Sequence, residues 1–360
     1  MIAGEFRSRR ERLLEKLPGL KAETLLVSSL PNIRYLSGFT GSNALLLVAP
    51  GEATLFTDPR YTVQSKQESD CRISIVKGPV YEGASKLISR RKWRTIGVER
   101  GGITYAAYIE LGKHFPINAS LVPVAPVVEE LRMIKSESEL RLIRRSVMTN
   151  STAYEKVVAR LKSNSTENDV AAELEYQMRR LGAEKAAFET IVASGARSAL
   201  PHAQPTSERI NRNRLLLVDM GAVQAGYCSD MTRMLHLGKP GTNARKLHKA
   251  VLEAQLAAID AVRENITASA VDRAARQVLK KHGMDKLFVH STGHGLGLEI
   301  HEPPRIGKRD KTRLKAGMVV TIEPGAYMEG FGGVRIEDTV VVTRTGCEIL
   351  TPTRKELLVV

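Results

Sequence analysis

The sequence predicts two domains of different class, an α/β domain followed by an α+β domain. The first observation is length, because 360 residues exceed the roughly 100 to 200 residues of a typical single domain. The second is that helix and strand patterns alternate in the first part of the chain, whereas long helices and hairpin-linked strands follow later. We therefore place an α/β domain at residues 1–128 and an α+β domain at residues 135–360.

The first domain begins with an amphipathic helix pattern near residues 5–17. The apolar runs TLLVSSL, NALLLVAP, ATLFTD, RISIVKG and TIGVER then predict strands, and helical segments interleaved with such strands are typical of an α/β domain. A proline-rich stretch at residues 121–126 closes the domain. We interpret it as an extended connection between the two domains.

The second domain opens at Ser136, which forms a capping box with Glu139 ahead of a long helical repeat. Further helices are predicted near residues 167–181, 243–263 and 269–282. Strands are predicted at 214–222, 227–237, 318–323 and 332–343. The resulting order predicts two helix pairs around an antiparallel sheet.

Composition limits the classes of function. The formal net charge is +15, but the 54 Lys and Arg residues are scattered among 39 acids, so we expect no nucleic-acid partner. No apolar run reaches the roughly 18 to 20 residues that cross a bilayer, and the charged N-terminus does not match a signal peptide, which predicts a cytoplasmic protein without membrane contact. Three cysteines without CxxC spacing are expected to be reduced.

Two acids flank a chain reversal in the stretch LLVDMGAVQAGYCSD. Asp219 ends an apolar strand, and we expect Gly221 and Gly226 to let the chain turn back so that Asp230 lies on a neighbouring strand. Standing alone, this pair fits solvent-facing turn residues equally well.

Further acids follow near the C-terminus. Glu323 ends the apolar run before Pro324, and the period of two in a predicted strand places Arg335 and Glu337 on one face. Burying four carboxylates without positive partners is very costly. These acids are therefore either spread over the surface or held together by cations.

Histidines complete the polar motifs. Glycines flank His294, so a metal ion and backbone can approach it closely. The same glycine run lacks the lysine and the spacing of a phosphate-binding loop. Three other histidines occupy motif-like positions, namely His202, His290 and His301.

The motifs DMGA, SDMTR, STGHGLG, HEPP, IEPG and RIED occur in this order. From about residue 135 to the end, the chain resembles the metal-dependent superfamily of creatinase, prolidase and methionine aminopeptidase, which has the pita-bread fold. The segments NIRYLSGFTGS and TDPRY look like the creatinase-type N-terminal domain of the Xaa-Pro dipeptidase and aminopeptidase P branch.

The resemblance implies a site with two divalent metal ions. Asp219 and Asp230 would bind one ion, Asp230 and Glu337 would bridge to the second, and His294 and Glu323 would complete that second site. Mn²⁺ is the expected metal, with Co²⁺, Fe²⁺ or Zn²⁺ as alternatives that this ligand set does not separate. Such ions lower the pKa of water enough to supply hydroxide near neutral pH.

The resemblance also implies roles for the surrounding residues. Glu323 would pass a proton from the nucleophile to the leaving nitrogen, and His202, His290 and His301 would orient the substrate and stabilise the oxyanion. Arg335 would orient a metal-binding carboxylate without binding the metal itself. Simpler roles compete: His202 as a loop residue, Arg335 as a structural ion-pair partner and His301 as a cap.

The function implied is a metallo-exopeptidase that cleaves between an N-terminal residue and a following proline, either an Xaa-Pro dipeptidase or an Xaa-Pro aminopeptidase. A dipeptidase needs a cation for the free carboxylate of its substrate, for which Arg60, Arg305 or the loop around Phe39 are candidates. The family suggests a homodimer. The alternatives are a creatinase-like hydrolase without metal and a catalytically silent pita-bread binding module.

Overall fold

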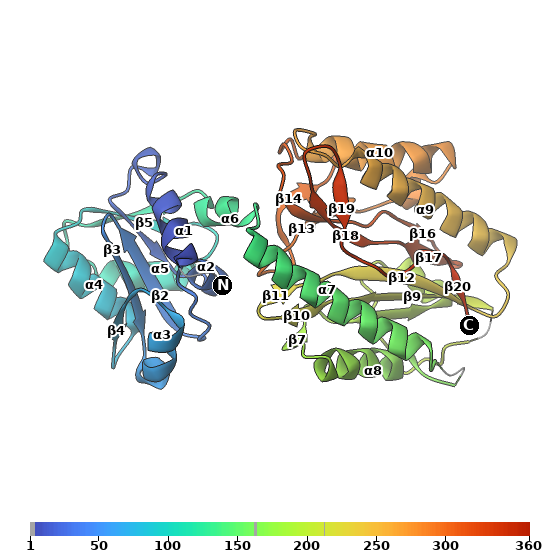
Figure 1. Cartoon of the computed structure of the whole chain (residues 1–360), viewed down its shortest axis with the longest axis horizontal. Helices are drawn as coiled ribbons and strands as arrows, with labels where there is room; N and C mark the ends of the chain where they lie inside the picture. Colours follow the sequence, from blue (N-terminus) through green and yellow to red (C-terminus); the bar gives the residue numbers. More distant parts are fainter. Residues whose placement is uncertain (1–3, 162–163, 212) are drawn as a thin grey trace. The chain divides into compact units, whose positions relative to one another are not determined.

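A computed structural model describes residues 4–161, 164–211 and 213–360 of the chain. The chain forms two compact units, one ending at Arg132 and the other beginning at Met133. Figure 1 shows a smaller unit of helices and strands and a larger unit with two pairs of long helices. This architecture confirms the predicted fold class, an α/β domain followed by an α+β domain with two helix pairs around a sheet.

The first unit is built on a six-stranded sheet with the order β4-β3-β2-β1-β5-β6. Its strands are β1 (Thr24–Val27), β2 (Ala44–Ala49), β3 (Glu52–Thr57), β4 (Arg72–Ile75), β5 (Thr95–Glu99) and β6 (Ser120–Val124). Its helices are α1 (Glu5–Leu14), α2 (Leu30–Ser37), α3 (Thr62–Glu68), α4 (Val80–Arg91), α5 (Tyr105–His114) and α6 (Val127–Arg132).

One sequence interpretation of this unit is wrong. The stretch at residues 121–126 does not connect the domains, because most of it lies in β6, which pairs in parallel with β5 at the edge of the sheet. Pro123 is tolerated there because an edge strand leaves one row of backbone N–H groups unpaired. Helix α6 then follows and still belongs to the first unit.

The second unit contains two helix pairs and several short sheets. Its helices are α7 (Glu137–Val158), α8 (Glu167–Arg180), α9 (Thr242–Ala261) and α10 (Ala268–Lys281). Its strands are β7 (Lys185–Ala186), β8 (Ile191–Ser194), β9 (Arg214–Met220), β10 (Ala222–Gln224), β11 (Tyr227–Cys228), β12 (Met231–Leu237), β13 (Gly293–Gly295), β14 (Glu302–Ile306), β15 (Val319–Ile322), β16 (Gly325–Met328), β17 (Gly332–Arg335), β18 (Asp338–Val342), β19 (Cys347–Ile349) and β20 (Leu358–Val359).

The two central strands, β9 and β12, carry apolar side chains on both faces. They pair antiparallel in register from Met220 and Met231 to Arg214 and Leu237. Leu215 and Leu217 pack into the core beside α9 and α10, while Leu216 and Val218 pack into the core beside α7 and α8. This alternation, which follows from the period of two in a strand, is why a helix pair covers each side (Figure 1).

Local sequence signals set the ends of several elements. The predicted capping box of Ser136 and Glu139 is present at the start of α7. The reversal after β9 occurs at Ala225 and Gly226, both with positive φ. Gly221 has a different reason to be glycine, because a Cβ there would lie 2.3 Å from the carbonyl oxygen of Ser229.

The predicted strand 332–343 is in fact two strands. β17 pairs with β16, whereas β18 pairs with β15 and β19, and Ile336 and Glu337 lie between them. The chain therefore changes sheets at Glu337, and the period-two argument that placed Arg335 and Glu337 on one strand face does not hold.

Cys71, Cys228 and Cys347 are free thiols. No helix within the described ranges is both long and apolar enough to span a membrane.

Candidate metal centre

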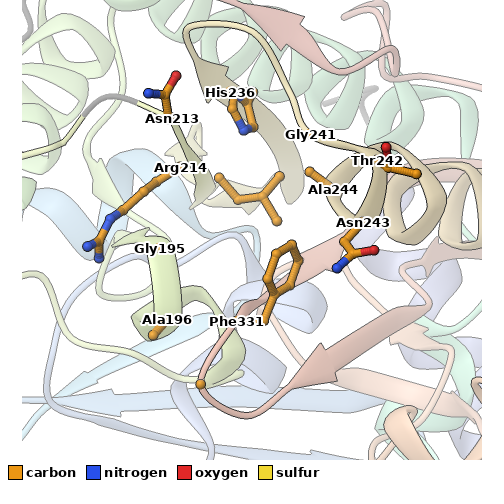
Figure 2. Close-up of a pocket in the computed structure, with 12 residues that line it drawn as sticks. Gly195, Ala196, Asn213, Arg214, His236, Gly241, Thr242, Asn243, Ala244 and Phe331 are labelled. Carbon is orange, nitrogen blue, oxygen red and sulfur yellow. The ribbon is translucent and has the colours of Figure 1, made fainter.

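All nine residues that the sequence singled out line one cavity of about 830 Å³ in the second unit. They arrive from different elements: the end of β9, the start of β12, β13, the end of β15 and the junction of β17 with β18, together with three loops. They are His202, Asp219, Asp230, His290, His294, His301, Glu323, Arg335 and Glu337. A separate cavity of about 460 Å³, with His236 and Phe331 on opposite sides of it, shares no lining residue with this one (Figure 2).

Three potential metal ligands converge most closely. One ligand atom each from Asp230, His294 and Glu337 lies within 4.8 Å of the other two. The Nε2 atom of His294 is also 3.4 Å from Oε1 of Glu323. Asp219 joins the group from β9, where it lies opposite Thr232 of β12.

His294 turns its second ring nitrogen, Nε2, toward the acids. Its Nδ1 atom lies 3.0 Å from the Gly295 carbonyl oxygen and therefore donates to it. In the neutral imidazole the lone pair is then on Nε2, which is 3.5 Å from Oδ2 of Asp230. An acceptor nitrogen that faces carboxylate oxygens is the arrangement of a metal ligand, because a cation between them supplies the missing positive charge.

Among the residues that the structure describes, two buried carboxylate oxygens have no hydrogen-bond partner, namely Asp219 Oδ1 and Glu337 Oε1. Both side chains are otherwise anchored, since Asp219 Oδ2 accepts from Arg335 at 2.6 Å and Glu337 Oε2 accepts from the Thr232 hydroxyl at 2.7 Å. An unpartnered buried carboxylate oxygen is costly. Divalent cations would satisfy both oxygens, so the residues present fit such ions.

The electrostatics agree with this fit. Burial raises the pKa of Asp230, Glu323 and Glu337, and the repulsion between neighbouring carboxylates raises it further. Each acid is therefore hard to ionise in the protein alone. Bound cations would reverse the effect and keep all of these acids charged.

Arg335 contacts the first acid rather than its neighbour in sequence. It donates from Nη2 to Asp219, from Nε to the Thr232 hydroxyl at 3.0 Å and from Nη1 to the Tyr327 hydroxyl at 2.7 Å. Thr232 in turn donates to Glu337. Arg335 thus holds Asp219 directly and reaches Glu337 through one hydroxyl.

His290 is engaged at both ring nitrogens. Nδ1 lies 2.8 Å from the Ser291 carbonyl oxygen and donates to it, so Nε2 accepts from the Tyr327 hydroxyl, also at 2.8 Å. Burial, followed by the charge of Arg335, lowers the pKa of His290 to about 4 and keeps the ring neutral. In this geometry His290 reaches a substrate only by exchanging one of these two bonds.

His202 and His301 are exposed to the cavity. The ring of His301 packs edge-on against that of His294 with 4.4 Å between centroids, and its pKa is lowered by burial and by the neighbouring histidines. Within the described part of the chain, no hydrogen bond is recorded for either ring. Their N–H groups are therefore available to a substrate.

Two residues of this arrangement were not found by sequence reasoning. Tyr327 links Arg335 to His290, and Thr232 links Arg335 to Glu337. The available signals were a tyrosine in a short strand directly after IEPG and the threonine inside SDMTR. Neither shows its partner, because the contacts join segments far apart in the chain.

The candidates for a carboxylate-binding cation differ in their surroundings. Arg305 lines the large cavity and also an adjoining cavity of about 260 Å³. Arg60 belongs to the first unit, where its guanidinium pairs with Asp58 at 2.9 Å. Phe39 also belongs to the first unit and packs edge-on against Tyr61.

The two parts of the chain match two different families of known proteins. Residues 141–344 match the sequence profile of metallopeptidase family M24, and residues 9–134 match the creatinase/prolidase N-terminal domain. The chain belongs to metallopeptidase family M24. The resemblance inferred from the motifs is thus confirmed, and membership in this family implies hydrolysis that depends on a divalent metal.

Full-length relatives show the same match. The chain is 37% identical over 354 residues to an Xaa-Pro dipeptidase of Pyrococcus furiosus, covering 98% of this chain and 100% of the relative. The solved structure of an Xaa-Pro dipeptidase from Bacillus anthracis superimposes with a TM-score of 0.96 at 34% identity, covering 99% of this chain and 100% of that one. An X-Pro aminopeptidase from Thermotoga maritima MSB8 gives a TM-score of 0.91 at 36% identity, covering 98% and 100%.

Proposed function

We propose that this member of family M24 is an Xaa-Pro dipeptidase, a metallo-exopeptidase that hydrolyses the bond between an N-terminal residue and a following proline. The observation that carries the proposal is the convergence of four acids and one histidine in a single cavity, where two buried carboxylate oxygens have no hydrogen-bond partner in the described part of the chain. The names of the relatives supply the proline specificity. We further propose residues 135–360 as the catalytic domain and residues 1–128 as the N-terminal domain.

We propose two divalent ions per chain, with Mn²⁺ as the first candidate. Asp219 and Asp230 would hold one ion, His294 and Glu323 would complete the site of the second, and Asp230 and Glu337 would bridge the two. When bound, the ions supply Lewis acidity and lower the pKa of water. The alternatives of a metal-free hydrolase and a silent binding module have no use for unpartnered carboxylate oxygens at these positions.

The chain's own residues would bind and orient the peptide and move the proton. An Oε atom of Glu323 would take the proton from the nucleophile and pass it to the proline nitrogen as that nitrogen leaves. His202 and His301, whose N–H groups face the cavity, would donate to the developing oxyanion. Tyr327 would hold Arg335 and His290 in place, so that Arg335 keeps Asp219 oriented.

Arg305 is our candidate for binding the free carboxylate of a dipeptide. Its side chain is exposed in the wall of the large cavity. A guanidinium binds a carboxylate through two parallel N–H groups, which gives both affinity and direction. The adjoining cavity beyond Arg305 favours a second candidate function, an Xaa-Pro aminopeptidase, because it offers space for a longer leaving group.

The test is hydrolysis of Ala-Pro and Ala-Pro-Ala by protein stripped with chelator and then supplied with Mn²⁺ or Co²⁺. Metal-dependent release of alanine from Ala-Pro alone is the expected result. Cleavage of the tripeptide at a similar rate would favour the aminopeptidase. Failure to cleave either peptide would contradict the proposal.

Two further properties complete the proposal. We propose a homodimer, which light scattering coupled to gel filtration would check, and a cytoplasmic location, which fractionation of the source cells would check. Neither property enters the argument for the reaction.

A further inference from the structure

Two oppositely charged residues outside the carboxylate cluster are buried against each other. The ammonium of Lys135 donates to Oε2 of Glu302 at 3.1 Å, and the two side chains are 1% and 3% exposed. A fully buried ion pair gains little net stability, because the attraction only offsets the cost of removing both charges from water. Stability alone therefore gives this pair no evident purpose.

Lys135 and Glu302 lie in two different segments of the second unit. Lys135 directly precedes the capping residue of α7, and its backbone N–H is held by the Gly317 carbonyl at 2.9 Å. Glu302 begins β14 and follows His301 in the chain. The ion pair thus joins the fixed start of α7 to the segment that carries His301.

The carboxylate of Glu302 also organises the loop before it. Oε1 accepts from the backbone N–H of Glu299 at 3.2 Å. Gly297 packs so closely on Glu302 that a Cβ there would lie 2.8 Å from both carboxylate oxygens. The Gly297 carbonyl in turn accepts from the backbone N–H of Cys228 at 2.7 Å. Loop 297–302 is therefore joined to β11 through Gly297, and the Glu302 carboxylate fixes the same loop through its contacts with Gly297 and Glu299.

The position of this loop determines the position of His301. The ring of His301 leans edge-on against that of His294, 4.4 Å away between centroids, and is otherwise exposed to the cavity. A second contact reinforces the same framework, because the Tyr227 hydroxyl of β11 donates to Glu139 in the first turn of α7 at 3.0 Å. The start of α7 therefore supports His301 through loop 297–302 and through the strand on which that loop rests.

We infer that Lys135 and Glu302 are positioning residues for His301 in peptide hydrolysis. The inference rests on the proposed function, in which His301 contacts the substrate. The Lys135 ammonium fixes the Glu302 carboxylate, and this carboxylate fixes loop 297–302. The loop in turn keeps the His301 ring at the reaction site. A displacement of about 1 Å at such a ring is enough to lower the rate of a reaction by about 100-fold.

The test compares three variants of the full chain loaded with Mn²⁺. Lys135→Met leaves Glu302 buried without its cation, and the double variant Lys135→Met with Glu302→Met removes both charges at similar volume. Arg144→Met is the matched control, because Arg144 lies on α7, the helix that Lys135 precedes, but forms an exposed ion pair with Glu348. The measurements are melting temperature, bound metal, kcat and KM for Ala-Pro, and hydrogen exchange of the loop 297–302 amides.

We expect Lys135→Met to lower both the melting temperature and kcat/KM, the latter by about 10- to 100-fold. The double variant should recover the melting temperature, since two apolar residues replace a buried pair without loss, yet keep the reduced kcat/KM and the faster exchange of the loop. Bound metal and the Arg144→Met control should stay at the wild-type level. Because the double variant is expected to fold, the test does not depend on the single one.

The inference is overturned if both kcat/KM and the melting temperature of the double variant return to the wild-type level, because the ion pair then contributes only to packing. Loop exchange at the wild-type rate in the double variant overturns it equally. Loss of bound metal would place the effect at His294 instead of His301. A wild-type protein that fails to cleave Ala-Pro refutes the proposed function, whereas the exchange measurement still decides whether the pair holds the loop.

Discussion

Removing the Tyr327 hydroxyl tests whether its hydrogen bonds keep Arg335 and His290 in position. Tyr327 is 8% exposed, and its hydroxyl accepts from Arg335 at 2.7 Å while donating to His290 at 2.8 Å. The substitution Tyr327→Phe deletes one oxygen atom and leaves the ring in place. It therefore leaves a charged donor and a neutral acceptor without this partner.

The magnitude follows from those two hydrogen bonds. A hydrogen bond to a charged group contributes about 1.5 to 3 kcal/mol and a neutral one about 0.5 to 1.5 kcal/mol. Arg335 Nη1 keeps the Pro201 carbonyl as an acceptor at 3.2 Å, which reduces its share of the loss. We expect the variant to lose about 2 to 3 kcal/mol of unfolding free energy. Because Arg335 also orients Asp219, metal affinity should fall by about 10-fold.

Urea denaturation of the metal-free protein measures the stability, and calorimetric titration with Mn²⁺ measures the affinity. Tyr154→Phe is the matched control. Tyr154 is a buried tyrosine of α7 whose hydroxyl has no recorded hydrogen-bond partner among the described residues. Its loss should change the unfolding free energy by less than about 0.5 kcal/mol. A Tyr327→Phe variant that matches this control in both measurements would refute the reasoning.

Four further outcomes are expected. Asp230→Asn should abolish turnover while circular dichroism shows the fold intact; activity at the wild-type level would rule out the two-metal site. Without metal, Glu337→Gln should be more stable than wild type, and denaturation at a series of pH values should show this difference growing as pH rises above about 4.5. The reason is that the pKa of Glu337 is raised in the folded protein, so the folded wild type binds the carboxyl proton of Glu337 more tightly than the unfolded chain does. A difference that does not change with pH would contradict this. His202→Ala should lower kcat with bound metal unchanged, and an unaltered rate would make it an ordinary loop residue. Arg305→Met should raise KM for Ala-Pro more than for Ala-Pro-Ala; equal effects would remove its role in binding the carboxylate.

The sequence predicted most of what depends on neighbours along the chain. The capping box at Ser136 and the ends of the four long helices follow from residues three or four positions apart. The acids and glycines of the motifs were also visible, because each motif is short and continuous. Where the pattern was read as one long strand, at 332–343, periodicity could not show that the chain changes its pairing partners at Glu337.

The sequence by itself determined the class of each domain, the order of the five expected ligands and the family to which the chain belongs. Only the tertiary structure decided which atoms those ligands face. Arg335 holds Asp219 across 116 positions, Thr232 reaches Glu337 across 105 and Lys135 reaches Glu302 across 167. Such pairs depend on strand register and helix packing, and a local pattern carries no information about which distant segment will lie opposite it.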